Sequence, residues 1–217
     1  MIIRKVEVNE NRALAKLHMQ VMPDFFLASL GEGFLTTYYK VVLRHPETIC
    51  LLAEDENKNI LGFVLGREKA KVYLKRILKS SLFTFVIEGI KLLFIKPKSL
   101  IRLVRNLDKI SKDSSISDTQ NYAEIGLIGV SPELKGQGIG HKLFEGFIGI
   151  LKERNVANLS LTSRPSPHIK HGGSLLCMNS RHILIEECLG LLKRYNYEHI
   201  TCLIFILSRT DCDVHDC

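Results

Sequence analysis

The sequence predicts an α/β (α+β) fold in a single domain, and three observations support this prediction. Segments with strand-type and helix-type spacing of apolar residues alternate along the 217 residues. Two apolar runs, at 48–54 and 60–68, are joined by the polar, turn-forming DENKN. A third apolar run, at 122–130, is followed by a glycine-rich turn and an amphipathic segment at 138–153. A chain of this length can bury a sizeable core, so we expect one domain over 1–217.

The N-terminal part is expected to contribute an edge strand and two helices before the hairpin. The strand is predicted in the first eight residues, MIIRKVEV. Apolar residues then recur at helical spacing over 11–22 and 24–44. Asp24, which follows Pro23, is a candidate N-cap of the second helix.

A basic segment follows the hairpin. Residues 71–111 predict two or three short helices, with breaks near Ser80 and at Pro97. Over 69–112 the chain holds twelve Lys or Arg and two acidic residues, a local charge of +10, which leaves −3 for the rest of a chain whose net charge is +7. A basic surface suits nucleic acid, but the segment has neither zinc-ligand spacing nor an RNA-binding aromatic signature, so no nucleic-acid partner is expected.

The insertion has two interpretations. The run SLFTFVIEGIKLLFI, at 81–95, is too short to span a bilayer. With its flanking Lys and Arg it could lie at an anionic membrane surface or cover a lipid-linked acceptor. Alternatively, it forms a helical lid that packs on the sheet and exposes a basic face to solvent.

The C-terminal part, at 164–217, departs in composition from the rest. We expect a strand at 156–162, a helix near 183–195 and a strand at 200–207, but residues 164–182 lack a helical period. Five of the six cysteines and five of the eight histidines lie in this part. The sequence lacks a secretory signal, so free thiols and a cytoplasmic location are expected.

A zinc site could be assembled from residues of this C-terminal part. The candidate ligands are His168 and His171, or Cys212, His215 and Cys217. Neither group has a second pair at suitable spacing, so no metal is expected.

The glycine-rich turn carries the clearest chemical signal. In ELKGQGIGHK three glycines alternate, at Gly136, Gly138 and Gly140. A strand, a glycine turn and a helix place free N–H groups around a concavity that suits phosphate. A tight turn that binds no ligand can have the same glycine spacing. A dinucleotide fingerprint would need glycine where His141 stands, and a phosphate loop of NTPases would need Gly-Lys followed by Ser or Thr.

The stretch GVSPELKGQGIG resembles the acetyl-CoA motif of the GNAT superfamily of N-acetyltransferases, Q/R-x-x-G-x-G/A, which follows a strand ending in V-x-P. Lys135 stands where the family has Gln or Arg, and Gly138 and Gly140 match the motif. The resemblance is strongest over 120–162. It implies a mixed, mostly antiparallel sheet with splayed central strands and flanking helices, and acetyl-CoA as cosubstrate.

The resemblance also implies a set of cofactor-binding residues. The backbone of Ile128, Gly129 and Val130 would pair with the pantetheine arm like an added strand. The pyrophosphate would be wrapped by the residues of the loop and of the first helical turn, Lys135, Gly136, Gln137, Gly138, Ile139, Gly140 and His141.

Two residues are candidates for the proton transfers of acetylation. Glu124, in YAEIGLIGV, stands where histone-type members of the family have a catalytic glutamate, and its alternative is a solvated carboxylate at a strand start. The family's usual acid, a tyrosine, is replaced by Leu192. Tyr195 lies about one turn further along the expected helix and is the substitute candidate, or else a packing or exposed residue.

The expected function is therefore acetyl transfer from acetyl-CoA to a primary amine of a small molecule, with an amino sugar as one option. Two alternatives stay open. The chain could be a CoA-binding protein impaired in catalysis, as the missing tyrosine suggests, or an acetyltransferase of proteins or peptides. A homodimer is also left open.

Overall fold

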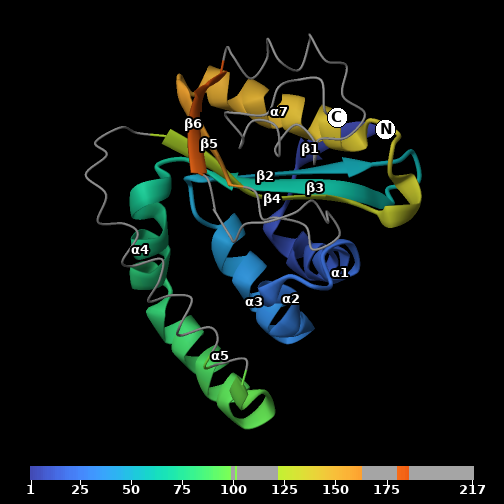
Figure 1. Ribbon diagram of the computed structural model, residues 1–217. Helices are drawn as coiled ribbons and strands as arrows, with labels where there is room; N and C mark the ends of the chain where they lie inside the picture. Colours follow the sequence, from blue (N-terminus) through green and yellow to red (C-terminus); the bar gives the residue numbers. More distant parts are fainter. Residues whose placement is uncertain (99–100, 102–121, 163–179, 186–217) are drawn as a thin grey trace, which may run out of the picture.

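The computed structural model describes residues 1–98, 101, 122–162 and 180–185. Within these residues six strands form one mixed sheet in the order β1-β2-β3-β4-β5-β6 (Figure 1). Neighbouring strands are antiparallel, except that β4 and β5 are parallel. The strands are β1 (Ile2–Lys5), β2 (Thr48–Glu54), β3 (Ile60–Arg67), β4 (Tyr122–Val130), β5 (Asn158–Thr162) and β6 (Ser180–Leu184).

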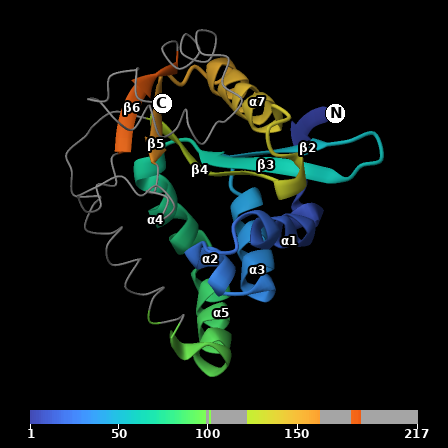
Figure 2. The same cartoon turned by 45° about the vertical axis from the view of Figure 1, so that its right-hand side comes forward.

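Helices cover both faces of this sheet (Figures 1 and 2). On one face lies α7, and on the other lie α1 and α3 with the short α2 beside them. The helices of these layers are α1 (Asn11–Val21), α2 (Phe26–Ser29), α3 (Glu32–Leu43) and α7 (Ile139–Glu153), and the 3₁₀ turns are η1 (Val8–Glu10) and η2 (Pro132–Leu134). The predicted α/β class, with a mostly antiparallel sheet between helices, is confirmed.

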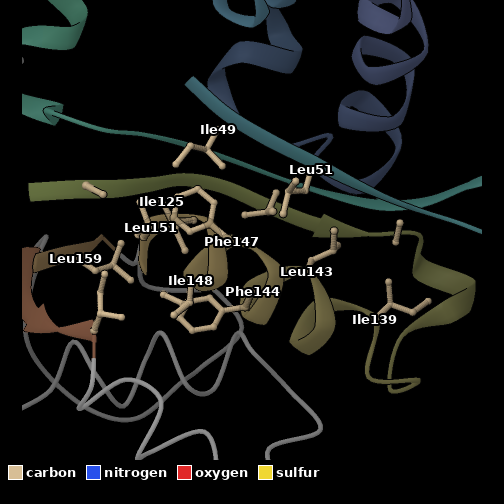
Figure 3. Close-up of a cluster of buried hydrophobic side chains, with 14 residues drawn as sticks. Ile49, Leu51, Ile125, Ile139, Leu143, Phe144, Phe147, Ile148, Leu151 and Leu159 are labelled. Atoms are coloured by element: carbon tan, nitrogen blue, oxygen red, sulfur yellow. The ribbon is translucent and has the colours of Figure 1, made fainter. Parts of the chain in front are cut away.

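Two apolar layers hold the helices to the sheet. Figure 3 shows the first, in which Phe144 and Phe147 of α7 are fully buried and Phe147 lies beside Ile125. In the second layer, Leu14 and Leu35 from α1 and α3 pack in one cluster with residues of β2 and β3. Each large side chain buried in this way stabilises the fold by roughly 1.5–3 kcal/mol.

The strand β4 contributes to both layers. Ala123 and Ile125 belong to the cluster on the α7 side, whereas Leu127 packs against the cluster on the α1 and α3 side. Side chains of a regular strand alternate between its two faces, so Leu127 would share the face of Ala123 and Ile125, but the register shift between them turns it to the other face. With β3 on one edge and β5 on the other, β4 is an internal strand. The prediction that 122–130 forms a central strand is confirmed.

A bulge interrupts β4 at Gly126. Leu65 of β3 lies opposite Leu127, but the next residue of β3, Gly66, lies opposite Ile125, so Gly126 is an extra residue in β4. The pairing of β4 with β5 ends at the same point, because Ile125 and Leu161 are the last partners. Among the described residues, the two central strands are therefore not paired beyond Ile125.

Two sequence predictions about helices are wrong in detail. The helix expected at 24–44 is divided, because Gly31, with φ of 94°, interrupts it between α2 and α3. Asp24 is not a helix cap, since Phe25 occupies the N-cap position of α2.

The helix expected near 183–195 was predicted to start too early in the chain. Residues 183 and 184 belong to the strand β6, and 186–195 lie outside the described residues. The strand expected at 200–207 lies outside them as well.

The basic insertion begins with two helices, α4 (Ala70–Ser80) and α5 (Leu82–Ile95), which meet at Ser81 as predicted. From α4, Tyr73 and Ile77 are buried in the cluster beneath β3. From α5, Leu92 is buried with Phe34 of α3. Figure 1 shows α5 extending beyond the sheet. The interpretation of the insertion as a lid that packs on the sheet therefore fits α4 but not most of α5.

Candidate active site

The loop between β4 and α7 is open around its glycines. Gly136 and Gly138 have φ of 87° and 71°, a left-handed region that glycine enters without strain. A Cβ atom added to either residue would meet no other atom within 4 Å. The glycines are thus required by the turn and leave free space beside it.

The first turn of α7 borders this space. Gly138 is the N-cap, and the earliest helical hydrogen bond runs from the Lys142 N–H to the Gly138 carbonyl. The N–H groups of the first turn consequently have no acceptor within the helix, and they lie at its positive end. Such a helix end favours a phosphate or another anion.

The predicted loop residues differ in exposure. Lys135, Gly136 and Gln137 are exposed, whereas Ile139 is buried in the core on the α7 side and fixes the start of the helix. His141 is half-buried, with Nε2 3.3 Å from the Glu145 carboxylate. The seven predicted loop residues therefore lie together in the turn after β4 and the first turn of α7.

The strand edge beside the loop is also accessible. Ile128, Gly129 and Val130 pair with β3 on one edge. The pairing with β5 on the other edge stops at Ile125, so within the described residues no strand covers that edge beyond the bulge. Backbone groups of an uncovered edge can bind an extended ligand as an added strand.

Gly129 also determines how close α1 lies to this strand. A Cβ atom at this position would come within 2.7 Å of Val21 Cγ2 and 3.0 Å of Met22 Cε. The C-terminal end of α1 can rest directly on β4 only because position 129 has no side chain. The predicted binding strand is thus packed on one face while one edge is uncovered.

Glu124 lies before the bulge and forms an ion pair with Arg67 of β3. The two residues are register partners, and Arg67 Nε and Nη2 donate to Glu124 Oε2 at 2.9 and 2.5 Å. The Glu124 side chain is 19% exposed. Burial lowers the pKa of Arg67, but the charge and hydrogen bonds of Glu124 outweigh this effect, and the net shift is upward. Arg67 therefore stays protonated beside Glu124.

The ring of Tyr73 lies beside this ion pair. Tyr73 of α4 lies 5.5 Å from the Arg67 guanidinium, measured to the ring centroid, and shares a 2.7 Å hydrogen bond with the Thr48 hydroxyl. Burial raises the pKa of Tyr73, so its phenol stays protonated at neutral pH. The sequence analysis missed Arg67 and Tyr73. The sequence predicts that Arg67 lies at the end of a hairpin strand, but it does not predict that Arg67 pairs with Glu124 across the sheet.

Some predicted residues lie outside the described part of the chain. Tyr195, the candidate acid, and Leu192 are among them. The considered zinc ligands, at 168, 171, 212, 215 and 217, are also outside. In the described part, Glu124 lies in β4 and the glycine loop follows the end of the same strand. The role of Tyr195 stays a prediction.

Comparison with known families gives one sequence match. A model described as the acetyltransferase (GNAT) family matches residues 14–169, well over half of the chain. No curated protein matches the chain by sequence.

Solved structures of several acetyltransferases are similar in fold. An aminoglycoside 6'-N-acetyltransferase complexed with coenzyme A is 13% identical, with a TM-score of 0.47 over 77% of this chain and 64% of that chain. The ribosomal-protein-S18-alanine N-acetyltransferase from Escherichia coli is 15% identical, with a TM-score of 0.45 over 77% and 69%. Naa20 from Chaetomium thermophilum, in complex with a bisubstrate analogue, is 18% identical, with a TM-score of 0.43 over 77% and 65%. The chain spans about two thirds of the length of each, and similarity at this level does not identify an acceptor.

Proposed function

Because the chain belongs to the acetyltransferase (GNAT) family over residues 14–169, we propose that it transfers the acetyl group of acetyl-CoA to a primary amine of a small molecule. The family and the enzyme class predicted from the sequence are confirmed by this membership. The observation that carries the proposal is the continuous arrangement of Glu124, the bulge at Gly126, the uncovered strand edge and the glycine turn before α7. When bound, acetyl-CoA supplies an acetyl group activated as a thioester.

The glycine turn is the proposed site for the pyrophosphate. Its support is the free space at Gly136 and Gly138, together with the first-turn N–H groups of Ile139, Gly140 and His141. Lys135 is exposed beside the turn and adds a positive charge. Gln137 adds an exposed amide donor.

The edge of β4 is the proposed site for the pantetheine arm. Ile128, Gly129 and Val130 can offer backbone donors and acceptors there, because no described residue of β5 pairs with them. At about 3.3 Å per residue, Glu124 lies about 7 Å along the strand from the bulge at Gly126. A ligand that extends from the turn along this edge therefore leads toward Glu124.

Glu124 is the proposed general base. An alkylammonium with a pKa of ~10 must lose a proton before it can attack an acyl carbon. Arg67 occupies Oε2, whereas Oε1 makes no hydrogen bond within the described residues. We assign to Oε1 the acceptance of the amine proton, directly or through one water molecule, while Arg67 fixes the orientation of the carboxylate.

Tyr195 remains the proposed acid for the departing thiolate. The sequence supports this only by proximity to the family's tyrosine position, at Leu192. If Tyr195 serves, Tyr195→Phe should lower the rate well below wild type. A rate within about threefold of wild type would remove it from the mechanism and make solvent the proton source.

A second candidate function is CoA binding with impaired transfer. One oxygen of Glu124 is held by two donors of Arg67, and a leucine stands at the family's tyrosine position. Both observations favour loss of proton transfer without loss of the glycine turn. Acetylation of a protein or peptide amine is the third candidate, and the same assay separates all three.

The test is release of free CoA by the purified protein from acetyl-CoA, with amino sugars, polyamines, aminoglycosides and peptides as acceptors. We expect release with one small-amine class. Release with peptides alone would replace the proposed acceptor by a protein or peptide. Binding of acetyl-CoA with no release for any acceptor would support the CoA-binding alternative.

A further inference from the structure

The exposed side of α5 is apolar along its whole length. At about 100° per residue, seven of the eight exposed large apolar side chains of α5 cover a continuous arc of about 140° of the helix. Two of them, Phe83 and Phe94, are 78% and 82% exposed and lie near opposite ends of the helix. The seven are Leu82, Phe83, Val86, Ile87, Ile90, Leu93 and Phe94, and the eighth, Ile95 at the end of the helix, lies outside the arc. We name this set the α5 apolar face.

The opposite side of α5 anchors the helix to the protein. Leu92 is buried beside Phe34, and Glu88 is 8% exposed. The Glu88 carboxylate accepts a hydrogen bond from the Thr37 hydroxyl at 3.2 Å and pairs with Lys91 at 2.7 Å. A soluble helix normally buries its apolar side and exposes its charges. Here the acidic group faces inward while the α5 apolar face points outward.

The surroundings of the α5 apolar face are strongly basic. Residues 69–98 contain eight Lys or Arg, and their only acidic residue is the inward-facing Glu88. Lys75, Lys79 and Lys98 are exposed and form no ion pair with any described residue. Lys75 and Lys79 lie on α4, which directly precedes α5, and Lys98 lies just beyond the end of α5.

From this combination we infer that α5 binds the surface of an anionic membrane, with its apolar face in the interfacial layer. Charge complementarity selects this occupant: a basic segment that also carries an exposed apolar helix face is attracted to anionic lipid head groups. A second copy of the chain is a poorer match, because it would bring an equally basic segment to the same place. At about 21 Å, α5 is shorter than a bilayer core, and no helix in the described parts is long and apolar enough to cross one.

The test is co-sedimentation of the full chain with vesicles of phosphatidylcholine alone, or of phosphatidylcholine with about a third phosphatidylglycerol. We expect binding to the anionic vesicles, weak binding to the neutral ones, and a decrease with added salt. The double variant Phe83→Asp and Phe94→Asp should lower the partition coefficient by about 100-fold or more, because both aromatic rings leave the interface and two negative charges replace them.

The matched control is Ile2→Asp, which introduces a charge at an exposed apolar residue of β1, outside the insertion. It should bind vesicles like wild type. Equal binding by the double variant, or no binding by wild type, would overturn the inference. If wild type is instead dimeric in solution without vesicle binding and the double variant is monomeric, the face joins two copies and the inference is also wrong.

Discussion

Glu124 is the residue on which the proposed proton transfer depends most. Glu124→Gln keeps the shape of the side chain but removes the base. We expect the rate of CoA release at neutral pH to fall by roughly 10²-fold or more, and to recover at high pH, where the amine loses its proton unaided. Acetyl-CoA binding, measured by calorimetry, should survive, because Glu124 lies before the bulge and outside the glycine turn.

The control for this variant is Glu32→Gln. Glu32 also forms an ion pair with an arginine, Arg12, but this pair joins α3 to α1, and the two side chains are 40% and 72% exposed. Its substitution should leave the rate unchanged. Loss of rate and of cofactor binding together in Glu124→Gln would mean that the ion pair with Arg67 is structural, and the assigned role would be wrong.

His18 predicts a pH dependence of stability. It is buried in α1, and burial lowers its pKa to about 4 from an unfolded value of ~6.5. The unfolded chain therefore takes up this proton first as the pH falls, so stability decreases below about pH 6.5, and the loss is complete near pH 4. Between pH 7 and pH 5 the cost is about 2 kcal/mol.

Urea unfolding at pH 7 and pH 5 measures this contribution. His18→Leu should reduce the difference between the two pH values by about 2 kcal/mol. Tyr39→Phe removes the partner of the 2.6 Å hydrogen bond to His18 Nδ1 but keeps the imidazole, so it should retain the pH dependence. The same pH dependence in His18→Leu and wild type would exclude His18 as its source.

For single residues, the sequence was sufficient to predict Glu124 as a candidate base but not to identify Arg67 as its partner. The prediction of Glu124 rested on the residues next to it in the sequence, which resemble a strand of the family. The pairing with Arg67 joins positions 57 residues apart and depends on the register between β3 and β4, which a bulge shifts by one residue. Local spacing contains no information about such a shift.

Among the elements, the contact between α1 and β4 is unusually sensitive to a side chain at Gly129. Gly129→Ala would place Cβ 2.7 Å from Val21 Cγ2, so the end of α1 must move. We expect a loss of about 1–3 kcal/mol in the free energy of unfolding, measured in urea. Gly33→Ala in α3 is the control, because its Cβ would meet no atom within 4 Å, and alanine favours the helix. Equal stability of the two variants would show that α1 is not held closely by β4.

Elements with a strong local pattern were predictable. The hairpin at 48–68 and the helix after the glycines follow from alternation, turn residues and helical spacing, and the break at Ser81 follows from two adjacent serines. The break at Gly31 was missed because a single glycine leaves the surrounding helical pattern intact. The bulge at Gly126 was also missed, since it is defined only relative to β3.

For the whole molecule, the layers around the sheet followed from the apolar patterns, and the placement of α5 did not. Its run of large apolar residues suggested packing on the sheet as one interpretation, yet one side of this helix is exposed. An apolar sequence predicts that one side of a helix will be buried, but it does not indicate whether the same chain or another surface covers that side. The molecule thus combines a packed core around β4 with a helix that extends outward (Figure 1).

The turn between β4 and α7 is proposed to bind acetyl-CoA, and thermal unfolding tests this most directly. The measurement is the stabilisation by acetyl-CoA of wild type, Gly138→Asp and Gly149→Asp. Ligand at about 100 times its dissociation constant should stabilise wild type by about 2.7 kcal/mol. Gly149 lies in α7 with no atom near its Cβ position, so its variant carries the same charge away from the turn and should keep the shift. Gly138→Asp should abolish it, because a carboxylate would stand where the pyrophosphate is proposed to bind. An unchanged shift in Gly138→Asp would contradict the account.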